Sequence, residues 1–186
     1  DVLIGCQVPI RPEKMMACSS GQDTLVNIAG YDGNGDLFIL METLFGGWGG
    51  RLAGDGNEVC SPPITNNSKI PIESNENVYP DIIYEQMALV ADTEGAGRYR
   101  GAPSIEVEFG PAEENSMRVL YVADGTINPA AGARGGGPGA LIQVFKRGGN
   151  GEVTPLPAYG DVELGPGETI ISISSGGGGY GPHRPE

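Results

Sequence analysis

The chain has 186 residues, which is enough for one domain with an apolar core. Its 24 acidic residues outnumber its 11 basic ones, and the formal net charge of −13 at pH 7 argues against nucleic acid and anionic membrane surfaces as partners. No apolar run approaches the roughly 20 residues that cross a bilayer, so we expect a cytoplasmic protein. The 32 glycines and 15 prolines predict a chain with many turns and little helix.

Six runs have the length and the β-branched or aromatic content of strands: residues 24–29, 36–42, 104–109, 116–122, 140–145 and 169–174. Turn residues separate them, which favours antiparallel hairpins and meanders. In the third run apolar residues alternate with Glu106 and Glu108, so one face should be buried and the other wet. The sequence therefore predicts a mainly β (α+β) fold, a sandwich- or barrel-like unit with long glycine-rich loops and one helix.

Residues 140–145 and 152–157 are expected to form one hairpin, with its proline-containing second strand at a sheet edge. Helix is expected over Val78–Leu89, with Pro80 in its first turn, and a strand over residues 81–90 is the competing interpretation.

Composition gives no boundary between domains, so residues 1–186 are interpreted as a single domain. The Gly/Pro/Ala-rich stretch 125–139 has too few apolar residues to pack by itself and should form a loop lying against another segment. Residues 176–186 are interpreted as a glycine-rich turn followed by a tail.

Two glycine-containing segments imitate binding motifs but lack their context. Asp32–Asp36 resembles the start of a calcium loop, yet Leu37 and Thr43 stand where such a loop needs glycine and glutamate, so a hairpin turn is favoured. Residues 95–101 approximate a dinucleotide-binding loop but precede a strand instead of a helix. Their glycines are better explained by close approach of the backbone to another segment.

The sequence identifies no catalytic residue and no metal site. Cys6, Cys18 and Cys60 are widely spaced, and the single histidine, His183, lies near the end of the chain, so neither a zinc ligand set nor a catalytic triad can be assembled. No P-loop motif is present, so any ATP should be bound outside this chain.

Four segments, residues 41–51, 64–73, 95–101 and 164–181, resemble in order and spacing the C-terminal portion of the hydantoinase B/oxoprolinase family. That family includes N-methylhydantoinase B, the larger subunits of acetone and acetophenone carboxylases, and the C-terminal part of 5-oxoprolinase. The resemblance implies a component of an ATP-dependent enzyme that hydrolyses a cyclic amide (a hydantoin, a lactam or 5-oxoproline) or carboxylates a ketone.

The resemblance also implies partners. ATP and a divalent metal would be bound outside this chain, by a hydantoinase A-type subunit and by the N-terminal part of the B-type subunit, in a hetero-oligomer that acts on a small molecule. The chain alone should be inactive. The alternative is a non-catalytic structural or assembly module of such a complex, and a carbohydrate-binding module is weaker because the chain has one Trp.

Site residues follow from residue type at the positions that match. We expect the following to line a substrate pocket: Glu42, Gly46, Gly47, Arg51, Thr65, Asn66 and Glu73. The amides of Phe45–Arg51 could bind an oxyanion, or this segment could be a strand corner packed under Trp48. We expect the following to meet a partner or to order loops: Arg98, Arg100, Gly176, Gly177, Gly178 and Gly179.

Overall fold

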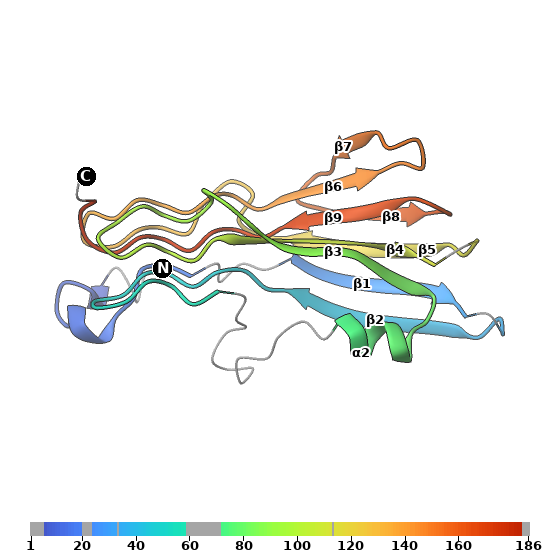
Figure 1. The fold of residues 1–186 in the computed structure, drawn as a ribbon, viewed down its shortest axis with the longest axis horizontal. Helices are drawn as coiled ribbons and strands as arrows, with labels where there is room; N and C mark the ends of the chain where they lie inside the picture. Colours follow the sequence, from blue (N-terminus) through green and yellow to red (C-terminus); the bar gives the residue numbers. More distant parts are fainter. Residues whose placement is uncertain (1–5, 20–23, 33, 59–71, 113, 184–186) are drawn as a thin grey trace.

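The structure is a computed structural model that describes residues 6–19, 24–32, 34–58, 72–112 and 114–183. Two antiparallel sheets share one apolar core, with strand orders β2-β1-β5-β8 and β3-β4-β9-β6-β7 (Figure 1). The elements are η1 (Pro12–Lys14), β1 (Thr24–Tyr31), β2 (Leu37–Leu44), α2 (Ile72–Val78), β3 (Ile82–Val90), β4 (Ser104–Pro111), β5 (Met117–Ala123), β6 (Gln143–Arg147), β7 (Val153–Pro155), β8 (Tyr159–Leu164) and β9 (Thr169–Ile173). The mainly β prediction is confirmed.

Local sequence explains much of this sandwich. Along β5, Met117, Val119 and Tyr121 face the core and alternate with exposed residues, as expected for a strand with one buried face. Asp32–Asp36 forms the β1–β2 turn, in which the carboxylate of Asp32 accepts the amides of Asn34 and Asp36 at 2.9 and 2.8 Å. The predicted hairpin turn is confirmed, as is the β6–β7 hairpin with β7 at the sheet edge.

The helix predicted over Val78–Leu89 is wrong. Residues 82–90 form β3, which pairs along its length with β4, and the α-helix precedes it as α2. Pro80 lies just beyond the end of α2, where it cannot continue a helix. Pairing with a neighbouring strand outweighed the helical spacing of the apolar residues, so the competing strand interpretation is correct.

One strand was not expected from the sequence. Strand β8 pairs with β5, and its inward positions are Gly160, Val162 and Leu164. A glycine at an inward position hides the apolar alternation. A Cβ added to Gly160 would lie 2.7 Å from the hydroxyl oxygen of Tyr121, so that large ring occupies the space.

The expected wet face of β4 is only partly wet. Glu108 is buried, and Arg147 donates to both of its carboxylate oxygens at 2.7 and 3.0 Å. The hydroxyl of Thr169 donates to the same carboxylate. These hydrogen bonds, that of Arg147 first, lower the pKa of Glu108 and keep it charged under its neighbours. A paired charge thus replaces water on this face.

Beyond the sandwich, several strands continue as extended glycine-rich segments that run side by side (Figure 1). We call these segments the glycine bundle: residues 15–19, 45–57, 93–103, 130–140 and 174–182. The successive amides of residues 176–181 donate, in order, to the carbonyls of Ala140, Ala102, Cys18, Gly137, Tyr99 and Ala133. Residues 176–181, the first part of the stretch expected to form a turn and a tail, are therefore buried among the other four segments, whereas Pro182 and His183 are exposed. The 125–139 stretch packs partly against residues 176–181.

Glycine is required for this packing because the segments approach through their backbones. A Cβ added at Gly176, Gly177, Gly178 or Gly179 would overlap a carbonyl group of a neighbouring segment. The same holds for Gly101, whose Cβ would overlap the carbonyl of Gly177. The expectation of close backbone approach in residues 95–101 is confirmed.

Replacement of Gly101 by alanine should destabilise the chain by about 1–3 kcal/mol or more, because neither backbone can move without breaking the bundle. The matched control is Gly149→Ala, where the nearest atoms lie 3.7 Å from the added Cβ, and its effect should stay within about 0.5 kcal/mol. Urea unfolding measures both. Equal effects of the two substitutions would contradict this account of the bundle.

Candidate functional site

Glu42 sits in a hydrogen-bonded cluster that joins the two sheets. It faces inward from β2, the edge strand of the four-stranded sheet, whereas Tyr84 comes from β3, the edge of the other sheet. The hydroxyl of Tyr84 donates to Glu42 Oε2 at 2.6 Å, and the side-chain amide of Asn75 in α2 donates to the same oxygen. The helix therefore closes the open side of the sandwich through this carboxylate.

A second acidic side chain of α2 also bonds to Tyr84. Glu76 in α2 accepts the backbone amide of Tyr84 at 2.8 Å. That amide lies where the β3–β4 register shifts between Tyr84 and Gln86, so it is bonded by a side chain at an irregular point of the ladder.

The cluster raises the pKa values of both Glu42 and Tyr84. Burial raises the pKa of Glu42, and the hydrogen bonds from Tyr84 and Asn75 only partly oppose it. Burial, followed by the hydrogen bond to Glu42, raises the pKa of Tyr84. Tyr84 therefore remains a donor, and the pKa of Glu42 lies above its ordinary value of 4.5.

The structure separates the residues expected to share a pocket. Glu42 lies in the sandwich, whereas Arg51 lies in the glycine bundle, where its Nη1 donates to Asn57 Oδ1 at 3.2 Å. Gly46 and Gly47 are buried where β2 continues into the bundle. Glu73 is exposed on α2. Thr65 and Asn66 lie outside the described residues.

The amides proposed for oxyanion binding are used within the chain. The amide of Trp48 donates to Asn57 O at 3.0 Å and that of Gly50 to Gly178 O at 2.8 Å. The amide of Arg51 donates to Gly54 O, and that of Gly49 to Ser19 Oγ. This part of the segment is a packed piece of the bundle, so these four amides are not free for a ligand.

The remaining expected residues also have partners within the chain. Arg100 pairs with Glu94 at 3.3 Å, and its amide donates to Asp55. The guanidinium of Arg98 lies over the ring of Tyr99, 5.5 Å from its centre. Gly176–Gly179 are ordered by the neighbouring segments of the same chain.

Sequence reasoning missed the partners of Glu42. Asn75 and Glu76 lie on a helix that was expected further along the chain, and Tyr84 was assigned to that helix. A strand reading of residues 81–90 would have placed Tyr84 on the inner face; no local signal singles out Asn75.

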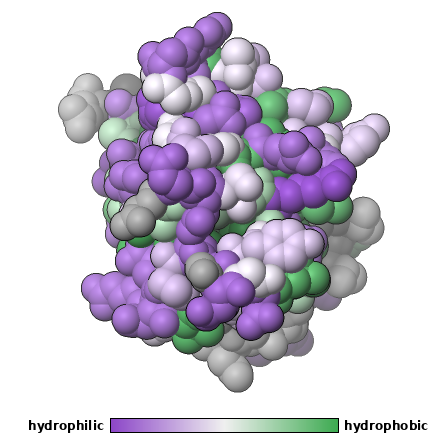
Figure 2. All heavy atoms as spheres, turned by 90° about the vertical axis from the view of Figure 1, so that its right-hand side faces the viewer, coloured by the Kyte–Doolittle hydropathy of each residue, from purple (hydrophilic) through white to green (hydrophobic). Residues whose placement is uncertain are grey.

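A hollow beside α2 is lined by both polar and apolar side chains. This hollow of about 460 Å³ lies between the β1–β2 turn and the end of α2, lined by residues that include Asp32, Phe38, Tyr79 and Asp81. The end of the molecule that carries this turn is mostly hydrophilic (Figure 2). Within the described ranges, no three His, Cys, Asp or Glu side chains gather as a metal site would require. The same ranges contain no helix with the length and apolar character needed to cross a membrane.

Two substitutions of Glu42 distinguish the contribution of its hydrogen bonds to stability from that of its charge. Glu42→Ala removes the acceptor shared by two partly buried donors and should cost about 1–3 kcal/mol, whereas Glu42→Gln keeps an acceptor and should cost less. Urea unfolding of the chain measures both free energies, and equal losses would contradict the role of the acceptor.

The pH dependence of stability tests the effect of the charge of Glu42. Because the folded pKa of Glu42 lies above its ordinary value of 4.5, its contribution to stability is present below that value and is lost as the pH rises through the folded pKa. The free energy of unfolding of the wild-type chain should therefore fall, relative to that of Glu42→Gln, as the pH rises from 4.5 through the folded pKa. Parallel pH profiles would show that burial does not perturb this carboxyl.

Comparison with known proteins places the chain in a family. Residues 1–183 match the model of the family described as hydantoinase B/oxoprolinase. The chain is 32% identical over 181 residues to caprolactamase subunit beta of Pseudomonas jessenii, covering 91% of this chain and 30% of that protein. It is also 32% identical over 172 residues to an uncharacterised protein of Methanocaldococcus jannaschii, covering 91% of this chain and 29% of that protein.

Solved structures agree with the fold. The crystal structure of ATP-dependent caprolactamase from Pseudomonas jessenii is similar with a TM-score of 0.74 and 25% identity, over 96% of this chain and 32% of that one. A nucleotide-free structure of acetone carboxylase is similar with a TM-score of 0.75 and 14% identity, over 93% of this chain and 27% of that one. The chain thus spans about a third of the length of these proteins, and it belongs to the hydantoinase B/oxoprolinase family.

Proposed function

We propose that this chain is a component of an ATP-dependent enzyme that hydrolyses a cyclic amide. The observation that carries the proposal is the family match over residues 1–183, together with 32% identity to a caprolactamase subunit. Carboxylation of a ketone is the alternative reaction. It has less support, because the likeness to acetone carboxylase at 14% identity concerns the fold alone.

ATP fits this chemistry because an unactivated amide is a poor electrophile. Phosphoryl transfer from ATP to the amide oxygen makes the ring carbonyl carbon more electrophilic. Water then adds to that carbon, the ring C–N bond breaks as the nitrogen is protonated, and a second water hydrolyses the resulting acyl phosphate to release phosphate. We expect a hydantoinase A-type partner to bind ATP and the divalent metal, and the small-molecule substrate to be held jointly with other parts of a B-type subunit. A hetero-oligomer follows from this division of labour.

Within such an enzyme, the chain itself could act mainly as a structural module. A specific observation favours this second candidate function: Glu42 and the amides of residues 48–51 are engaged in contacts inside the chain. In that case the sandwich and the glycine bundle hold other elements in place, and substrate contacts come from elsewhere.

The reaction can be tested on the enzyme purified with all of its copurifying polypeptides. We expect ring opening of caprolactam, hydantoin or 5-oxoproline that requires ATP and releases phosphate, measured by product chromatography. Acetone with bicarbonate serves as the comparison substrate. Turnover that needs no nucleotide, or carboxylation of acetone without amide hydrolysis, would contradict the proposal.

The two candidate roles are separated by alanine substitutions in the same assembled enzyme. If the chain contributes to the substrate site, Glu42→Ala or Arg51→Ala should lower kcat/KM at least about tenfold while the mass of the complex is unchanged, a loss of roughly 1.4 kcal/mol. Lys14→Ala, which removes an exposed cation from η1, is the matched control for Arg51. Unchanged turnover in both variants would favour the structural module.

A further inference from the structure

The outer face of the four-stranded sheet is apolar and open. Its large side chains are between 45% and 74% exposed: Tyr31, Leu37, Ile39, Met41, Leu120, Val122 and Tyr159. By contrast, the outer face of the other sheet carries the ion pair of Arg147 with the buried carboxylate of Glu108, and Ile171 there is only 5% exposed. That sheet exposes fewer large apolar side chains, and those of Ile83, Leu89 and Val153 are 38–47% exposed.

Strand register makes these side chains neighbours. Leu37 lies opposite Tyr31 at one end of the β1–β2 pair, and Ile39 and Met41 follow along the same face of β2. Further across the sheet, Val122 of β5 lies opposite Tyr159 of β8. Exposed apolar side chains gathered on one face in this way mark a site of protein association.

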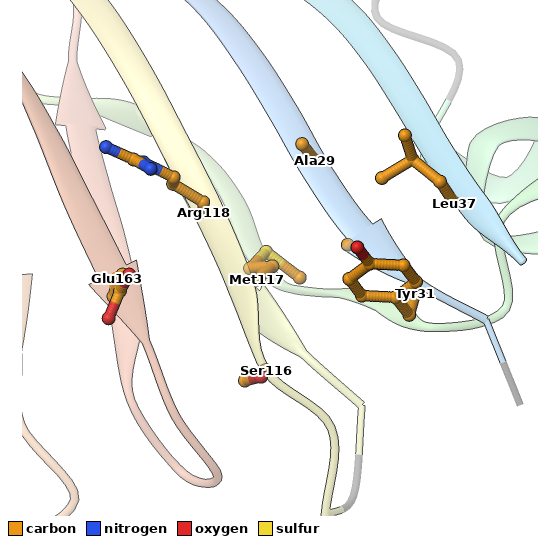
Figure 3. A pocket seen from close by; sticks show the side chains of 8 residues that line it. Ala29, Tyr31, Leu37, Ser116, Met117, Arg118 and Glu163 are labelled. Atoms are coloured by element: carbon orange, nitrogen blue, oxygen red, sulfur yellow. The ribbon is translucent and has the colours of Figure 1, made fainter. Parts of the chain in front are cut away.

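This face also contains a hollow and a charge. Figure 3 shows Arg118 and Glu163 on one side of a hollow of about 400 Å³ and Tyr31 and Leu37 on the other. Arg118 is paired with Asp161 of β8, and Glu163 acts electrostatically on the same guanidinium. Two carboxylates thus share one cation, so this side of the face carries net negative charge.

We propose that this face is the docking surface for the portion of a B-type polypeptide that the relatives carry outside the matched region. Caprolactamase subunit beta matches over only 30% of its length, so most of its chain is available to cover such a surface. The occupant presents apolar side chains to β1, β2 and β5 and a Lys or Arg to Asp161 and Glu163. Only the identity of the occupant rests on the proposed function.

The experiment measures how well the face is covered in the assembled enzyme, purified with all of its polypeptides. Met41→Cys and Ile127→Cys are labelled with a thiol reagent, and peptide mass spectrometry gives the rate at each position separately. Met41 is 67% exposed in this chain and Ile127, in the 125–139 loop, is 82% exposed, so similar rates are expected if nothing covers the sheet. We expect labelling at position 41 to be at least tenfold slower.

A bifunctional thiol cross-linker attached at position 41 identifies what lies there. Cross-links to B-type sequence outside the matched region support the proposal. Equal labelling rates at the two positions, or cross-links to the A-type subunit or to position 41 of a second copy, would overturn it. Neither readout requires catalysis, so a failure of the proposed reaction would leave this result interpretable.

Discussion

The structure depends on close backbone contact around residues 176–181. Their amides donate to carbonyls of three other segments, and a fourth donates back through the amide of Gly50 to Gly178 O. These hydrogen bonds form only because glycine lets the chains approach without side chains between them. The cost of ordering four consecutive glycines is offset by hydrogen bonds within the same chain.

The glycine bundle and the sandwich are parts of one construction. Strands β2 and β9 run directly into the bundle, and β4 and β6 begin where the chain comes back from it (Figure 1). The ends of these strands are therefore held by packing in the sandwich and by packing in the bundle. A small apolar cluster that contains Val8, Ala17, Ala133 and Tyr180 packs within the bundle. Tyr180 also donates its hydroxyl to Pro12 O at 3.1 Å, which ties the first described segment to the last.

The open side and the two outer faces of the sandwich carry different kinds of side chain. Glu42, Asn75 and Tyr84 close the open side of the sandwich, and the Arg147–Glu108 pair lies on the outer face of the five-stranded sheet. The outer face of the four-stranded sheet is left apolar. In a family whose members extend well beyond the matched region, such a face is better suited to contact with protein than with water.

The sequence by itself determined the fold class, most strands and the family, because apolar alternation, turn residues and ordered glycine motifs are local signals. It also indicated why residues 95–101 need glycine. Only the tertiary structure decided that residues 82–90 are a strand, because pairing with β4 acts across the chain. It also decided that Glu42 meets Asn75 and Tyr84 instead of Arg51, and that Gly176–Gly181 are buried. These features depend on contacts between residues far apart in sequence, and no local pattern encodes which segments will meet.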